Sequence, residues 1–365
     1  MKLSRNLPAL MGATALALVA GSHAFAKDTA TPIKHLVVIY QENVSFDHYF
    51  GTYPHATNPV GEPKFHSRKD TPTNIDTVEN AGLLTNNPNF TNPLNGAGAA
   101  NPFRLDFTQA ATADQNHSYT PEQQAEDNGA ADLFPLYTGN GTPGGVGAFG
   151  TTGQVMGYYD GNTVTALWNY AQRFAMSDAA RTDGYGPSTP GALEVVSGQT
   201  NGMDLVLDTN NKTSFYVDDG QGGYTMINDV DPANDVCSST SDAVLMEGKN
   251  IGDLLNQAHV TWGSFMGGFD LTQTDANGTT GCARTTTSTY TGVTEVDYIP
   301  HHAWFQYYTS TENPTHARPT SVAAIGHTKV PGTSTVDPAN HEYDIHDFYD
   351  AVKAGNFPSV SYIKA

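Results

Sequence analysis

The sequence predicts an α/β protein, built on one sheet with helices on both of its faces. Short apolar runs rich in β-branched and aromatic residues have the length of buried strands. Segments with helical spacing alternate with these runs along the chain, as in parallel sheets whose strands are joined through covering helices. Stretches rich in Gly, Pro and Asn separate the regular elements and predict long loop insertions.

The first predicted strand is Leu36–Tyr40, and polar residues follow it directly. Functional side chains of α/β folds gather where strands end. Hard oxygen ligands such as Glu42 and Asn43 suit a divalent cation or a site that handles phosphate. The residues leave an alternative open, in which a polar helix follows the strand and Ser45 or Asp47 caps it.

Turn residues dominate the next part of the chain. Residues 55–112 are rich in Asn, Pro, Thr and Gly, which predicts surface loop, and residues 139–153 are similarly rich in Gly. Between these stretches, Thr120 as N-cap with Pro121 at the first helical position predicts the start of a helix.

The segment Thr163–Ala175 has apolar residues at helical spacing, which predicts a helix lying on a sheet with Trp168 and Phe174 in the core. Residues 203–293 predict a loop-rich insertion that is polar and rich in Asp and Thr. Further predicted elements combine helical spacing or β-branched content with suitable caps: a helix at Asn250–Gln257, a strand at Val260–Phe265, a helix at Asp344–Ala354 with Gly355 as C-cap, and a strand at Pro358–Ile363.

The first 26 residues predict a signal peptide, with Lys2 and Arg5 before an apolar stretch and Ala24–Ala26 as a cleavage site. We therefore expect an exported protein, periplasmic or secreted, with residues 27–365 forming the folded domain. A retained N-terminal anchor stays an alternative, although the apolar stretch is short for a stable membrane span.

The chain is strongly acidic, with a formal net charge of −20 from 37 acidic and 17 basic residues. Removal of Lys2 and Arg5 with the signal peptide changes −20 to −22. Such a surface repels nucleic acid and anionic bilayers, so we expect no nucleic-acid partner. The charge can equally serve solubility alone.

The chain has two cysteines, Cys237 and Cys282. In an oxidising compartment such a pair predicts a disulfide, and two buried free thiols are the alternative.

Ser188 is the best nucleophile candidate, because it lies between a Gly-Pro turn and a Thr-Pro helix start. A serine at a helix N-terminus meets unpaired N–H groups that also hold phosphate. The residues alone allow Ser188 to be only an N-cap. His301 and His302 form a doublet after Pro300, so both can reach one ligand from a loop. His117 lies in a polar loop and is a weaker candidate.

Several motifs, in order, resemble the bacterial phosphoesterase family that holds phosphocholine-preferring phospholipases C and a class of acid phosphatases. The first motif has Val44 where family members usually have Arg. The serine-bearing motif leans toward the phosphatase-like branch. The matching segments extend over nearly the whole mature chain: residues 41–52, 114–117, 174–178, 186–192, 298–302 and 347–364.

The resemblance implies a fold similar to the alkaline-phosphatase-like α/β/α sandwich. It implies that Ser188 takes up the phosphoryl group, and that Glu42 and Asn43 bind a divalent metal ion whose identity is unknown. A metal-activated hydroxyl would attack phosphorus in line. The substrate would be a phosphate-ester small molecule or a phospholipid headgroup. Three histidines would line the phosphate pocket: His117, His301 and His302.

One departure from the family pattern shapes the functional hypotheses. Family members carry further aspartates that complete the metal site, and this sequence ends at Ala365 before such a motif, so we expect an incomplete C-terminal part. The first hypothesis is a hydrolase of acid phosphatase or phospholipase C type that works through a phosphorylated serine. The alternative is a catalytically inactive, truncated member of the same family. A third reading, a secreted adhesin or carbohydrate-binding module, draws on the aromatic cluster Trp304–Tyr308.

Overall fold

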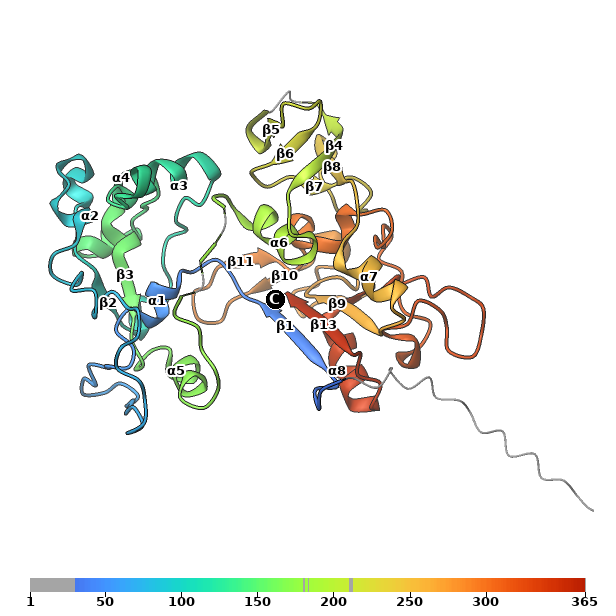
Figure 1. The fold of residues 1–365 in the computed structure, drawn as a ribbon, viewed down its shortest axis with the longest axis horizontal. Coiled ribbons are helices and arrows are strands. Elements are labelled where there is room, and N and C mark those ends of the chain that lie inside the picture. The colour runs from blue at the N-terminus through green and yellow to red at the C-terminus, as the bar shows by residue number, and fades with distance from the viewer. Residues whose placement is uncertain (1–29, 180, 183, 210–212, 365) are drawn as a thin grey trace, which may run out of the picture.

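A computed structural model describes residues 30–179, 181–182, 184–209 and 213–364, so the predicted signal peptide lies outside the described residues. At the centre of the larger part is a four-stranded parallel sheet (Figure 1). Its strands, in spatial order, are β1 (Leu36–Tyr40), β13 (Val360–Lys364), β9 (Trp262–Met266) and β12 (Glu342–Asp344). The first and last strands of the described chain are thus neighbours, and their carboxyl ends lie at one edge.

Helices cover both faces of this sheet. On one face, α6 (Ser188–Ser197) and α7 (Ile251–Gln257) share a hydrophobic core with the sheet residues Trp262 and Tyr362. On the other face, α8 (Ile345–Ala354) packs against β9 and β12. The prediction of a mixed α/β fold around a parallel sheet is therefore confirmed.

The helices of this part begin and end where their capping residues predict. Asn250 caps α7, and Asp344 caps α8 in a capping box with Asp347. Gly355, at φ 74°, takes the left-handed conformation that ends α8. The predicted strands and helices of this part agree with the structure within two residues at each end.

A second sheet lies beside the first and packs on the same core through Met203, Met226 and Val244. Its strands, in spatial order, are β5 (Tyr216–Asp218), β6 (Tyr224–Met226), β4 (Asn201–Asp208), β8 (Asp242–Met246) and β7 (Asp231–Pro232). The range 203–293, for which a loop-rich insertion is predicted, contains most of that sheet and also the predicted α7 and β9 of the main sheet. Its many polar residues lie on exposed strand faces, which hid the strands.

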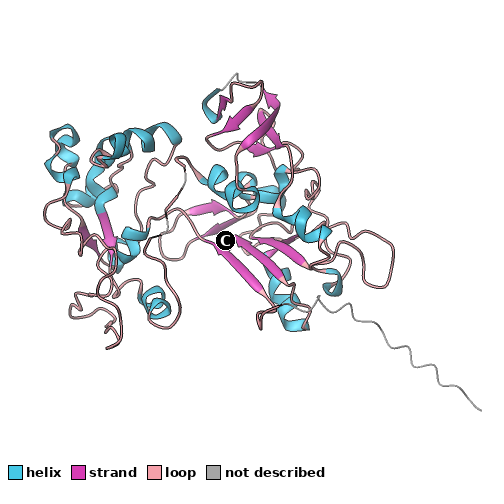
Figure 2. Cartoon of the chain, in the orientation of Figure 1, coloured by secondary structure: helices cyan, strands magenta, loops and turns pink. Residues whose placement is uncertain are grey.

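Residues 46–171 form a lobe at the left of Figure 1. Figure 2 shows that loops and short helices make up most of it. Its regular elements are α1 (Phe46–Phe50), α2 (Pro88–Thr91), β2 (Phe103–Leu105), α3 (Tyr119–Glu126), α4 (Phe134–Tyr137), β3 (Gly157–Tyr159) and α5 (Thr165–Ala171). A further ribbon of β10 (Thr285–Thr287) and β11 (Thr294–Val296) lies outside the lobe.

Three predictions for this lobe were wrong in part. Residues 55–112 are not all surface loop, because Asn87, Asn89 and Asn95 are buried and their side-chain amides bond to backbone atoms. The N-cap of α3 is Ser118, two residues before the predicted cap. Trp168 is fully buried, whereas Phe174 is 69% exposed because α5 ends at Ala171.

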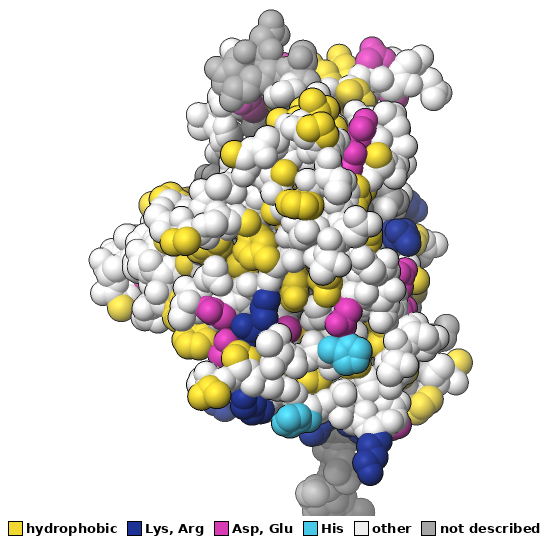
Figure 3. All heavy atoms as spheres, turned by 90° about the vertical axis from the view of Figure 1, so that its left-hand side faces the viewer, with side chains coloured by type: hydrophobic (Ala, Val, Ile, Leu, Met, Phe, Trp, Pro, Cys, Tyr) yellow, Lys and Arg dark blue, Asp and Glu magenta, His cyan; other side chains and the backbone are white. Residues whose placement is uncertain are grey.

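Three surface features bear on possible partners. Leu36 and Ile39 of the edge strand β1 are exposed. On the lobe face shown in Figure 3, acidic and basic side chains are interspersed, so no broad basic patch is seen on that face. Among the described residues, no helix combines the length and apolar character needed to cross a membrane.

Candidate active site

The carboxylate of Glu42, just past the end of β1, is the centre of a buried polar cluster. One of its oxygens lies 3.0 Å from Nζ of Lys364 at the end of β13 and 3.3 Å from Nε2 of His302. The hydroxyl of Ser188 favours the ionised form of the same carboxylate. The structure therefore brings together three residues that the sequence separates by more than a hundred positions, together with a lysine.

Ser188 is held at the N-terminus of α6 by the turn before it. Gly186 has φ +121°, a conformation that residues with a side chain rarely adopt, and a Cβ there would lie 2.6 Å from the carbonyl oxygen of Ile227. The N-cap position of α6 is Pro187, so Ser188 is the first helical residue and not the cap. Its side chain is consequently free of the capping role, and its hydroxyl favours the ionised form of Glu42.

The next residue, Thr189, anchors this helix terminus to Asp229. Its backbone N–H donates to Oδ1 of Asp229 at 2.9 Å, and its hydroxyl Oγ1 lies 2.8 Å from the same oxygen. Asp229 belongs to a connection of the second sheet. Its carboxylate accepts a hydrogen bond from an N–H that has no partner within the helix, and it lies at the positive end of the helix dipole.

His301 and His302 belong to a short 3₁₀ turn after β11, and their rings lie 4.7 Å apart at 84°. Because they lie in a turn and not in a strand, the two neighbouring rings do not point to opposite faces of a sheet. His302 faces Glu42, whereas His301 lies 3.7 Å from Asp229 and 3.5 Å from Asp231.

The environments of these histidines shift their pKa values in opposite directions. Burial and the ammonium of Lys364 lower the pKa of His302 to about 4, although the charge of Glu42 opposes the change. Burial also lowers the pKa of His301, but Asp231 and Asp229 outweigh it and raise that pKa above 6.5. At neutral pH, His302 is therefore a neutral imidazole, whereas Asp231 and Asp229 favour the protonated form of His301.

The ionised form of Glu42 is favoured despite its burial. Burial alone raises the pKa of this carboxyl group. Lys364, His302 and the Ser188 hydroxyl together outweigh burial and lower the pKa below 4.5. An ionised carboxylate within reach of a serine hydroxyl can accept its proton.

The structure does not place Asn43 and His117 in the same cluster. Asn43 is exposed beside Glu42. Nδ1 of His117 bonds to the carbonyl of Gln115, and none of the contacts described for His117 reaches Ser188 or Glu42. Its link to the site passes through Glu122 of α3, which accepts a hydrogen bond from the amide of Gly186. Burial raises the pKa of Glu122, and His117 partly opposes this change.

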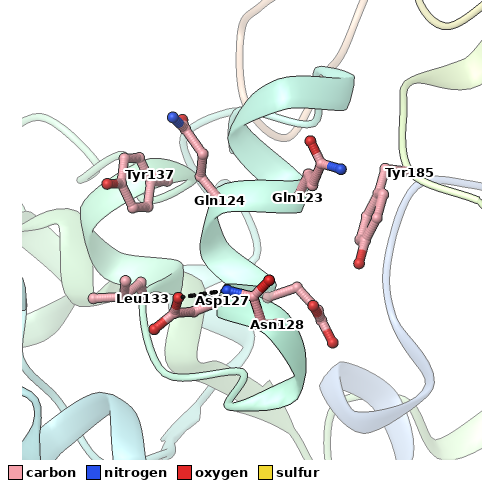
Figure 4. A pocket seen from close by; sticks show the side chains of 8 residues that line it. Gln123, Gln124, Asp127, Asn128, Leu133, Tyr137 and Tyr185 are labelled. Carbon is pink, nitrogen blue, oxygen red and sulfur yellow. Dashed lines mark hydrogen bonds between the residues drawn. The ribbon is translucent and has the colours of Figure 1, made fainter.

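Two shallow hollows flank α3 near this link. One, of about 500 Å³, includes His117 and its loop. The other, of about 340 Å³, is drawn in Figure 4, where Gln123 and Gln124 project from α3 and Tyr137 and Tyr185 stand on either side. Neither hollow is lined by Ser188 or Glu42, so the reactive cluster lies outside them.

The described residues around Glu42 do not fit a divalent metal ion. Such an ion takes six or more oxygen ligands and several negative charges. Glu42 is the one carboxylate in contact with this cluster's serine and lysine, and the ammonium of Lys364 already balances its charge at 3.0 Å. The predicted metal site at Glu42 and Asn43 thus lacks donors in the described part of the chain.

A different group of side chains brings three potential ligand atoms within 4.8 Å of one another: Asp235, Cys237 and His316. Cys237, however, is bonded to Cys282, so its sulfur is no thiolate ligand. Asp235 already accepts hydrogen bonds from Tyr298, Gln306 and His316. The group is therefore a buried network whose hydrogen-bonding groups have partners within the protein. The Cys237–Cys282 disulfide itself confirms the predicted pairing.

Sequence reasoning missed Lys364, Thr189 and Asp229. Lys364 carried a usable signal, because it is a charged residue at the end of an apolar strand whose carboxyl end lies beside that of β1. Thr189 is adjacent to a predicted nucleophile. For Asp229 no pattern in the sequence indicates its position, since it belongs to a distant connection between two strands of the second sheet.

Known proteins and one protein family are similar to this chain in sequence. The chain is similar to phospholipase C A from Mycobacterium tuberculosis, strains CDC 1551 / Oshkosh and ATCC 25618 / H37Rv, at 35% identity over 96 residues. That match covers 26% of this chain and 15% of each relative, so it spans a small part of their length. The model of the phosphoesterase family matches residues 33–365. With a match over nearly all of the described residues, the chain belongs to the phosphoesterase family.

Proposed function

We propose that the protein hydrolyses phosphate esters through a phosphorylated Ser188, in the manner of an acid phosphatase or phospholipase C. One arrangement carries the proposal: Ser188, the first residue of α6, favours the ionised form of Glu42, whose carboxylate lies 3.0 Å from Lys364 and 3.3 Å from His302. We extend the proposal to an alkaline-phosphatase-like sandwich fold, on the support of the parallel sheet with helices on both faces.

In the proposed reaction, the phosphoryl oxygens bind the ammonium of Lys364 and the backbone N–H of Ser188, because the N–H of Thr189 already bonds to Asp229 and Pro190 has none. Oγ of Ser188 forms a bond to phosphorus, and its proton passes to the carboxylate of Glu42. The bond from phosphorus to the leaving alcohol breaks, and that alcohol takes a proton from His301. Water then attacks phosphorus and gives one proton to His301. The bond from phosphorus to Oγ of Ser188 breaks, and Oγ takes back the proton from Glu42.

The test compares the mature protein with Ser188→Ala on p-nitrophenyl phosphate and on the p-nitrophenyl ester of phosphocholine. We expect the wild type to release p-nitrophenol and the variant to lose ~10⁴-fold or more in kcat, since the nucleophile is absent. Mass spectrometry of the acid-quenched wild type should find phosphate on Ser188. Equal turnover by the variant would remove Ser188 from the role, and the preferred ester separates phosphatase from phospholipase C.

A second candidate function is weak phosphate binding without turnover. It draws on the Glu42–Lys364 ion pair, which lies where the family resemblance implies a metal ion. Titration calorimetry and the p-nitrophenol assay together distinguish the two functions. A catalytically silent protein binds inorganic phosphate in the calorimeter and releases no p-nitrophenol from either ester. We also propose export to the periplasm or medium, which N-terminal sequencing of the protein from culture fractions tests.

A further inference from the structure

Thr189 is completely buried, and its polar atoms join three segments that are distant in sequence. Its N–H and hydroxyl both contact Oδ1 of Asp229, in the connection between β6 and β7. The hydroxyl oxygen also lies 3.0 Å from the backbone carbonyl oxygen of His301. A hydroxyl group has one hydrogen, so the two acceptors share it and hold the side chain in one orientation.

The partners of Thr189 are themselves fixed. Oδ2 of Asp229 lies 3.7 Å from Nε2 of His301, so one carboxylate contacts both the helix terminus and the histidine. The buried hydroxyl of Tyr307 donates to the carbonyl of Val230 at 2.6 Å. On the other side, Asn228 accepts a hydrogen bond from the N–H of Tyr119 at the start of α3.

This geometry gives the second sheet a part in the active site. Because Ser188 and Thr189 are consecutive residues of α6, any shift of Thr189 also moves Oγ of Ser188. His301, whose carbonyl bonds to Thr189, moves with the same unit. A misplacement of a reacting group by about 1 Å can cost ~10²-fold in rate, even when ligand binding is little affected.

We propose that Thr189 and Asp229 are positioning residues that hold Ser188 and His301 in register for phosphoryl transfer. The inference rests on the proposed function, and it assigns the β6–β7 connection of the second sheet to the catalytic machinery. Neither residue needs to touch the substrate for this role.

The experiment compares Thr189→Val, which keeps the shape and removes the hydroxyl, with Thr189→Ser, which keeps the hydroxyl. We expect Thr189→Val to lower kcat ~10–100-fold with KM changed less than ~3-fold, because phosphate binding at the helix terminus persists. Thr189→Ser should keep kcat within ~3-fold of the wild-type value.

The matched control is Thr311→Val. Thr311 is also completely buried, and its hydroxyl donates to the carbonyl of Phe305 and accepts from Asn250, away from Ser188. It should lower the melting temperature as Thr189→Val does, with kcat unchanged. If Thr189→Val matches this control in both quantities, Thr189 is merely structural and the proposal is overturned.

Two further measurements cover the remaining outcomes. Should Thr189→Val fail to fold, Asp229→Asn takes its place, since it keeps the size and one oxygen; unchanged kcat in this variant overturns the proposal. Orthovanadate, which mimics the trigonal-bipyramidal phosphorus, gives a readout without turnover. We expect Thr189→Val to weaken vanadate binding ~10-fold or more and phosphate binding little. This comparison decides the inference even if the wild type hydrolyses no ester, which would contradict only the proposed function.

Discussion

Glu342 at the start of β12 shows how one buried acid can set the pH dependence of stability. Its side chain is buried beside Asp235, and burial, reinforced by that charge, raises the pKa of Glu342 well above 4.5. In the folded protein the carboxyl group therefore keeps its proton at a pH where the unfolded chain has lost it. Stability from this group is present below pH 4.5 and falls as pH rises toward the folded pKa.

Replacement by glutamine tests this reading. Glu342→Gln keeps the shape and is neutral at every pH, so its free energy of unfolding relative to wild type should rise with pH above 4.5, by up to about 1.4 kcal/mol per pH unit. Below pH 4 the two proteins should be nearly equal. Urea unfolding at pH 4, 6 and 8 measures the difference. A difference that does not grow with pH would mean that the group ionises freely in the folded state.

At the scale of elements, the turn into α6 is the most constrained connection near the site. Gly186 lies at φ +121°, and a Cβ there would come within 2.6 Å of the Ile227 carbonyl. Gly184, two residues earlier, has its nearest such neighbour at 4.0 Å. These two glycines therefore offer a matched comparison within one loop.

We expect Gly186→Ala to destabilise the fold by about 1–3 kcal/mol, because alanine strains the left-handed backbone and clashes with the second sheet. Its kcat should fall as well, since the displaced turn carries Ser188. Gly184→Ala should leave both quantities near wild type. Thermal melting and p-nitrophenyl phosphate hydrolysis measure the pair, and equal behaviour of the two variants would contradict the assigned constraint.

The main-sheet elements were predictable from sequence because their signals are local. The run Leu36–Tyr40 is a strand with the predicted bounds, and Gly355 ends α8 as predicted. The second sheet was missed because its short, polar strands carry little periodicity. Phe174 was misplaced because helical spacing continues in the sequence after α5 has ended. Tertiary contacts decide such positions, and a single sequence does not contain them.

The candidate site was predictable in the same uneven way. Ser188, Glu42 and His302 belong to recognisable motifs, and the structure places them together. Asp229 has no motif, since its role depends on how the second sheet packs against α6. His117 lies in a motif as well, but its contacts reach the site only through Glu122.

At the scale of the whole molecule, the protein is expected to be stable without a divalent ion, because the described residues at Glu42 supply too few donors. Chelation with EDTA, or addition of calcium, manganese or zinc, should leave the melting temperature of the wild type unchanged. A bound ion at a hundredfold excess over its Kd would add about 2.7 kcal/mol. This expectation would be contradicted if metal addition raised the melting temperature of the wild type but not that of Glu42→Gln, a result that would support a metal site at Glu42.

The pairing of β1 with β13 has a consequence for when activity can appear. Glu42 follows the first strand and Lys364 ends the last strand that the structure describes, so their ion pair closes only after the ribosome has made both. A nascent chain that has completed α6 already carries Ser188 but has no ammonium to balance the carboxylate beside it. Under the proposed function, hydrolysis of phosphate esters begins only after translation has passed β13.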